Sequence, residues 1–84
     1  MNDDPVFDAL RHSIVTVMND IPAEAITVGA RLRDLGANSV DRAEILTLTM
    51  QKLRLRVPLL EFARAENIGG LVELMRAKVP ARDS

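Results

Sequence analysis

The segment that decides the fold reads Leu35-Gly36-Ala37-Asn38-Ser39-Val40-Asp41-Arg42-Ala43-Glu44. Gly36 can adopt the positive φ that ends one helical turn. Asn38 is a favourable N-cap, because its side chain can accept a hydrogen bond from the amide of Val40 or Asp41. Ser39 therefore falls at or beside the first position of a helix. Unpaired backbone N–H groups and the helix dipole make that position favourable for a phosphate.

The residues before this segment are expected to form one helix and a long connection. Asp4-Pro5 predicts a helix start, with the acid as N-cap and the proline as first helical residue. Apolar residues at helical spacing predict that this helix continues to about Met18. Residues 19–37 contain proline and glycine and keep no sustained period. We expect apolar residues along this connection to pin it to the bundle: Ile21, Ile26, Val28, Leu32 and Leu35. We also expect a short helical turn over residues 30–35.

Three helices are predicted from the serine onward. The first spans Ser39 to about Leu53, and Val57-Pro58 breaks the chain after it. A short helix is predicted over residues 59–64, where Leu59, Leu60, Phe62 and Ala63 would close one end of the core. The last helix is capped by Asn67 and stopped by Pro80, and the tail after it should fray.

Composition favours a small all-α domain. The chain has 84 residues, two phenylalanines as its only aromatic residues, abundant aliphatic residues and no cysteine, so helices must pack without a disulfide. We expect one domain over residues 1–84, with an ordered core of about residues 5–79. The paired glycines Gly69 and Gly70 indicate close packing of backbones, because no strand-to-helix phosphate loop surrounds them.

Charge and hydropathy exclude several function classes. A net charge of −1 does not favour general nucleic-acid binding. Arg54 and Arg56 lie beside a proline that breaks the helix, which disfavours a helix-turn-helix DNA-binding motif. No apolar run approaches a membrane span, and the N-terminus is acidic where a signal peptide would be basic. We therefore expect a soluble cytoplasmic protein, a monomer with no membrane partner.

The chain carries no recognisable catalytic constellation. Its one histidine, His12, is expected to be exposed and to take no part in catalysis or metal binding. The sequence contains no metal-binding or phosphate-loop motif. We expect no enzyme activity, no catalytic residues and no metal site.

The sequence resembles the acyl carrier protein family over roughly residues 7–79. The triplet Asn38-Ser39-Val40 matches the family's Asp-Ser-Leu or similar triplet, residues 32–37 match its approach to the serine, and residues 67–74 look like its last helix. The resemblance implies a four-helix bundle with a long first loop and a short third helix. It also implies that Ser39 is esterified to 4'-phosphopantetheine by a phosphopantetheinyl transferase that uses coenzyme A and magnesium. The thiol of that arm would carry an acyl group as a thioester.

The helix after the serine is apolar over more of its circumference than one buried stripe needs. Ile45, Leu46, Thr49 and Leu53 can form the inward stripe. The remaining apolar residues can also belong to the core, but the resemblance implies that partner enzymes dock on this helix. The expected docking residues are Asn38, Val40, Asp41, Arg42, Glu44, Thr47 and Met50.

Among carriers, residues 36–44 are most similar to the freestanding carriers of polyketide β-branching. Such a carrier would hold a malonyl and then an acetyl group for a 3-hydroxy-3-methylglutaryl-type synthase, with an acyltransferase and a decarboxylating ketosynthase as further partners. A fatty-acid carrier and a peptidyl or aminoacyl carrier are the alternatives within the class. An unmodified helical adaptor, in which Ser39 is only a cap, is the alternative outside it. The weakly charged second helix departs from the acidic docking helix of many carriers.

Overall fold

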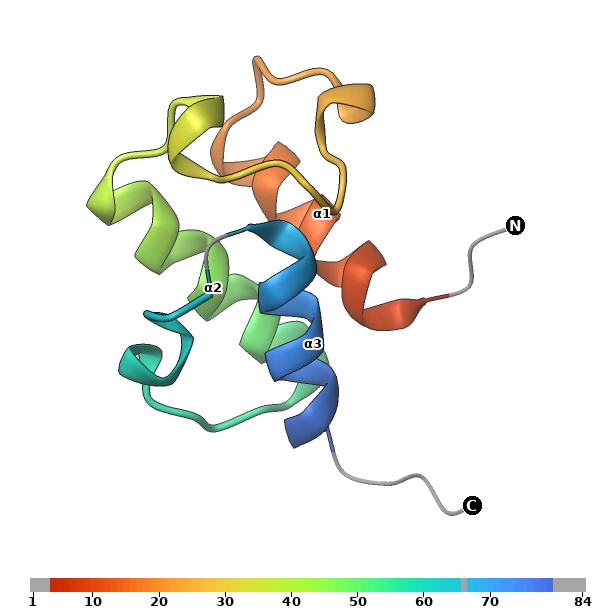
Figure 1. Cartoon of the computed structure of the whole chain (residues 1–84), viewed down its shortest axis with the longest axis vertical. Coiled ribbons are helices and arrows are strands. Elements are labelled where there is room, and N and C mark those ends of the chain that lie inside the picture. Colours follow the sequence, from red (N-terminus) through yellow and green to blue (C-terminus); the bar gives the residue numbers. More distant parts are fainter. Residues whose placement is uncertain (1–3, 66, 80–84) are drawn as a thin grey trace.

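The chain folds into three α-helices joined by long connections with short 3-10 turns (Figure 1). A computed structural model describes residues 4–65 and 67–79. Its elements are α1 (Pro5–Val17), η1 (Ala23–Ala25), η2 (Arg33–Leu35), α2 (Ser39–Leu53), η3 (Leu59–Phe62) and α3 (Ile68–Lys78). Residues 4–65 and 67–79 contain no strand, so the all-α prediction is confirmed.

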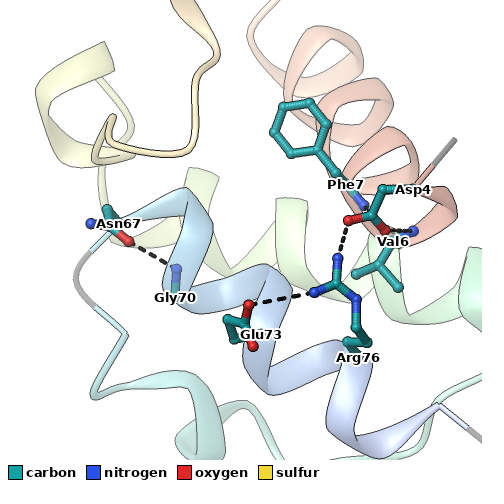
Figure 2. A network of polar contacts seen from close by, with 7 residues as sticks. All are labelled: Asp4, Val6, Phe7, Asn67, Gly70, Glu73 and Arg76. Atoms are coloured by element: carbon teal, nitrogen blue, oxygen red, sulfur yellow. Dashed lines mark hydrogen bonds and ion pairs between the residues drawn. The ribbon is translucent and has the colours of Figure 1, made fainter. Parts of the chain in front are cut away.

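Helix α1 begins where the sequence predicts and is tied to α3 at that end. One oxygen of Asp4 accepts hydrogen bonds from the amides of Val6 (3.0 Å) and Phe7 (3.3 Å). Its other oxygen pairs with the guanidinium of Arg76 on α3, as Figure 2 shows. The N-cap of the first helix therefore also contacts the last one.

One apolar core joins the three helices. Each helix contributes side chains with no exposed surface: Leu10 and Ile14 from α1, Ile45 and Thr49 from α2, and Ile68 and Met75 from α3. Helix α1 packs chiefly against α2 and less against α3. Thr49 is accommodated because its hydroxyl donates to the carbonyl of Ile45 at 2.7 Å, which satisfies the buried polar group.

The long connection between α1 and α2 is anchored by buried side chains and by backbone hydrogen bonds to the start of α3. Ile26 and Leu32 are buried as predicted, whereas Val28 is 61% exposed and was wrongly expected to point inward. The backbone explains the difference, because the carbonyl of Val28 accepts from the amide of Gly69 at 2.8 Å. The carbonyl of Ala30 accepts from the amide of Ile68 at the same distance. The connection is therefore held at Val28 by its backbone, and the side chain faces outward.

The predicted third helix is a 3-10 turn, and no fourth α-helix occurs in the part of the chain that the structure describes. Only Phe62 of this turn is buried; Leu59 and Ala63 are exposed, and Leu60 is 81% exposed. A 3-10 turn repeats every three residues, so Leu60, Glu61 and Ala63 lie off the face that carries Phe62; Leu59 shares that face but stays 38% exposed at the start of the turn. The expectation that Leu59, Leu60 and Ala63 close the core is wrong.

The ends of α2 and α3 agree with the sequence to within one or two residues. Helix α2 stops at Arg54, which takes a left-handed conformation (φ 59°) and turns Leu55 into the core. Helix α3 ends at Lys78. Pro80, which was predicted to stop it, and the tail after it lie outside the described residues.

Candidate functional site

Backbone hydrogen bonds hold the turn into α2 two and three residues before the serine, at Ala37 and Gly36. Gly36 has φ 102°, a left-handed conformation that glycine adopts without a Cβ clash. Its amide donates to the carbonyl of Arg33, and the amide of Ala37 donates to the carbonyl of Leu32, both at 3.0 Å. Leu32 and Ala37 are both buried. The backbone that precedes the serine is therefore held by hydrogen bonds and by burial on both sides of the glycine.

A reciprocal capping box starts α2. The Oδ1 of Asn38 accepts from the amide of Asp41 at 2.8 Å, and the carboxylate of Asp41 accepts from the amide of Asn38 at 3.2 Å. This arrangement confirms Asn38 as the N-cap and fixes Ser39 as the first helical residue. A carboxylate in the first turn is also favoured by the helix dipole.

Ser39 presents its hydroxyl to solvent at this fixed position. Within the described chain, the amides of Ser39 and Val40 have no hydrogen-bond partner, as expected of the first positions of an open helix. The other described serine, Ser13, is fully buried and donates to the carbonyl of Ala9 at 3.0 Å. Of these two hydroxyls, only that of Ser39 can be reached by another protein.

Arg42 lies one turn after the serine and contacts it. One terminal nitrogen of its guanidinium donates to the Oγ of Ser39 at 3.5 Å, and the other donates to the carbonyl of Ala37 at 3.4 Å. The sequence identified Arg42 only as a docking residue. The i,i+3 spacing from Ser39 is the signal that predicts this contact, because such pairs are neighbours on a helix surface.

The structure separates the expected docking residues into surface and core. Asn38, Val40, Glu44 and Thr47 are exposed, and Asp41 and Arg42 are half-buried. Met50 is only 8% exposed and belongs to the apolar core, so its placement on the docking face was wrong. Met50 follows buried Leu46 by four residues, and that spacing puts the two side chains on the same face of α2.

A cleft of about 450 Å³ opens beside the serine segment. It lies between η2, α2, η3 and the start of α3, with apolar walls that include Leu46, Phe62 and Leu71. Three arginines, Arg31, Arg33 and Arg42, also line it. Sequence patterns alone did not predict this cleft, because its walls come from four segments that are distant in the chain.

The described residues contain no cluster of side chains arranged as a metal site. No group of three or more histidine, aspartate and glutamate side chains in residues 4–65 and 67–79 is arranged to hold a metal ion. His12 is exposed on α1. No helix in the same ranges combines the length and the apolar character needed to cross a membrane.

The donor set at the start of α2 suits an anion esterified to Ser39. Two amides without protein partners, the positive end of the helix dipole and the guanidinium of Arg42 all lie at or beside the hydroxyl. The rigid capping box holds these groups in place. A phosphodiester on the Oγ of Ser39 therefore fits the residues present.

Two comparisons with known proteins agree with this geometry. Residues 8–75 match a family model described as "Phosphopantetheine attachment site". The chain is 35% identical over 79 residues to the polyketide biosynthesis acyl-carrier-protein AcpK of Bacillus subtilis (strain 168). The aligned residues make up 94% of this chain and 96% of that relative. Both matches extend over all three helices, far beyond the serine segment. The chain thus belongs to the acyl carrier protein family, whose members hold 4'-phosphopantetheine covalently and leave the catalysis to their partner enzymes.

Proposed function

We propose that Ser39 carries the phosphopantetheine arm and that the protein is a donor carrier for β-branching in polyketide biosynthesis. In that role it would hold malonyl and then acetyl groups, and it would deliver acetyl to a 3-hydroxy-3-methylglutaryl-type synthase. The observation that carries the proposal is the exposed Ser39 hydroxyl at the first position of α2, behind a locked turn. The likeness to a carrier named for polyketide biosynthesis supports the choice of pathway.

The chain's own residues present the arm and identify the carrier to its partners. The thiol of the arm supplies the thioester that holds the acyl group. The capping box of Asn38 and Asp41 holds the backbone on either side of Ser39. Val40, which is 71% exposed, offers an apolar contact beside that oxygen. Asp41, Arg42, Glu44 and Thr47 surround it with polar groups of mixed charge, which set orientation and discriminate between partners.

The test of the donor role is acetyl transfer. The protein is produced with a broad-specificity phosphopantetheinyl transferase, its gain of one phosphopantetheine is verified by intact mass, and acetyl is loaded chemically. The loaded protein is then mixed with the synthase and a second carrier that holds a β-ketoacyl chain. We expect loss of acetyl from this protein and a gain on the second carrier of that acetyl group plus one water, because hydrolysis must release the addition product from its thioester with the synthase.

The same loaded protein offered to a fatty-acid condensing enzyme provides the control. Efficient transfer to that enzyme, with none to the synthase, would contradict the β-branching role and favour a fatty-acid carrier. A chain that gains no phosphopantetheine would instead be an unmodified adaptor. The Ser39→Ala variant is the matched negative control, because it keeps the helix start and removes only the hydroxyl.

A further inference from the structure

Arg42 has an unusual position for a docking residue. Its two terminal nitrogens bridge the Oγ of Ser39 (3.5 Å) and the carbonyl of Ala37 (3.4 Å). Both distances are beyond the usual range for N–H···O hydrogen bonds, so the contacts are weak. A guanidinium has five N–H donors, and these two long contacts leave most of its capacity unused.

No carboxylate neutralises this cation within the ranges that the structure describes. The ion pairs that join two described residues include those of Arg11, Arg76 and Lys78, and Arg42 takes part in none of them. The nearest acid in sequence, Asp41, directs its carboxylate to the amide of Asn38. Arg42 is therefore held at the serine without an acidic partner among residues 4–65 and 67–79.

Modification of Ser39 would change the electrostatics of this helix start. A phosphodiester adds a negative charge in the same first turn as Asp41, so the new charge is repelled by that carboxylate. Arg42 is the described cationic side chain that already contacts the modified atom. The non-bridging phosphate oxygens would lie only two covalent bonds beyond Oγ, and a hydrogen bond between them and the guanidinium would be charge-assisted.

We propose that Arg42 is the phosphate-binding residue of the modified protein. On this proposal, which rests on attachment of the arm to Ser39, its guanidinium leaves the hydroxyl oxygen and binds the non-bridging oxygens of the diester. The amides of Ser39 and Val40 stabilise the same anion from the helix end. Arg42 also lines the cleft beside η2 and η3.

The test compares the apo and the modified protein by NMR, without any partner enzyme. Proteins labelled with ¹⁵N at arginine are prepared as wild type, Arg42→Gln, Arg42→Lys and Arg33→Gln. Arg33 is the matched control, since it is exposed and lines the same cleft, but has no contact with Ser39. Intact mass establishes that each protein has gained one phosphopantetheine, and amide spectra establish that each is folded.

We expect the side-chain N–H signal of Arg42 to shift on modification and its hydrogen exchange to slow about two- to fivefold, the effect of a partly exposed ion pair. The ³¹P signal of the diester should move in Arg42→Gln and stay in place in Arg33→Gln. Arg42→Lys should fall between them, because lysine keeps the charge and loses the planar fork. Added salt should reduce the wild-type effect.

Two results would overturn the inference in distinguishable ways. A modified wild-type protein whose Arg42 signal and exchange match those of the apo protein, with the same ³¹P signal in Arg42→Gln, would refute Arg42 as the phosphate ligand and leave the carrier role intact. A wild-type protein that gains no phosphopantetheine would refute attachment itself, and this inference with it.

Discussion

The starts of α2 and α3 share a capping residue and differ in what covers them. Each follows an asparagine whose Oδ1 accepts from the third helical amide at 2.8 Å, Asn38 from Asp41 and Asn67 from Gly70. In α3 the first two amides are also used, because Ile68 and Gly69 donate to carbonyls of the long connection. In α2 the corresponding amides, of Ser39 and Val40, have no partner within the described chain.

This difference shows how one local motif serves two purposes. The cap alone starts a helix, and the covering loop decides whether the remaining donors are used internally. At α3 the donors hold the first connection against the bundle. At α2 they remain open beside an exposed hydroxyl, which suits a covalently attached phosphate. Asparagine followed by a helix is thus insufficient to identify a site.

The largest expected effect tests whether the two helix starts share one core. Leu46 on α2 and Leu71 on α3 are both buried and line the same cleft. Leu46→Ala and Leu71→Ala should each lower the free energy of unfolding by about 2–5 kcal/mol, measured by urea denaturation. If the two variants lose similar amounts of unfolding free energy, α2 and α3 contribute alike to the core, and they differ only in what covers their first turns. Curves that barely move for both variants would contradict the observed core.

The next effect concerns the covered helix start. A Cβ added to Gly69 would lie 3.0 Å from the carbonyl oxygen of Val28, which is backbone and must shift, whereas the nearest atoms to a Cβ on Gly70 are 3.4 Å away. Gly69→Ala should therefore cost about 1–3 kcal/mol. Gly70→Ala should be neutral or slightly stabilising, because alanine has the higher helix propensity. Equal losses in urea denaturation would show that the loop does not press on Gly69.

The two caps provide a smaller and more selective comparison. Asn38→Ala and Asn67→Ala should each cost about 1 kcal/mol, since each removes one cap hydrogen bond. Only Asn38→Ala should slow the transferase, because that cap holds the backbone next to Ser39, the proposed attachment site. Modification rates followed by intact mass test this, and an equal slowing by Asn67→Ala would mean that the two helix starts are not independent.

The smallest stability effect is expected at Val40. Val40→Asp should change the free energy of unfolding by no more than about 0.5 kcal/mol, because the side chain is 71% exposed. On chemically loaded protein, it should strongly reduce acyl transfer to the cognate synthase. Val28→Asp is the matched control, an exposed valine (61%) on the loop that covers α3, and it should leave transfer unchanged. Unfolding of Val40→Asp, or unimpaired transfer, would remove Val40 from the docking surface.

Local chemistry made most of the fold predictable from sequence. Asp4-Pro5, Asn38 and Asn67 start the helices where predicted, because capping depends on residues within one turn. Helical spacing likewise placed Ile45, Leu46 and Thr49 in the core. The exposed serine followed from the same local signals.

Two of the wrong predictions concern how distant segments of the chain pack against one another. The outward Val28 depends on a backbone bond to Gly69, and the exposed Leu60 depends on how a short turn docks. Met50 is different, because its i+4 relation to Leu46 was readable and argued for the core. The cleft beside the serine also needed the three-dimensional structure, since four segments form its walls.

The most direct test of the account is to locate the arm in the chain. The protein is treated with coenzyme A and a broad-specificity transferase, digested, and mapped by peptide mass spectrometry, with Ser39→Ala in parallel. We predict one phosphopantetheine on the peptide that contains Ser39, and a folded, unmodified Ser39→Ala. Modification of Ser13 or Ser84, a modified Ser39→Ala variant, or a wild-type chain that gains no mass would contradict the central claim.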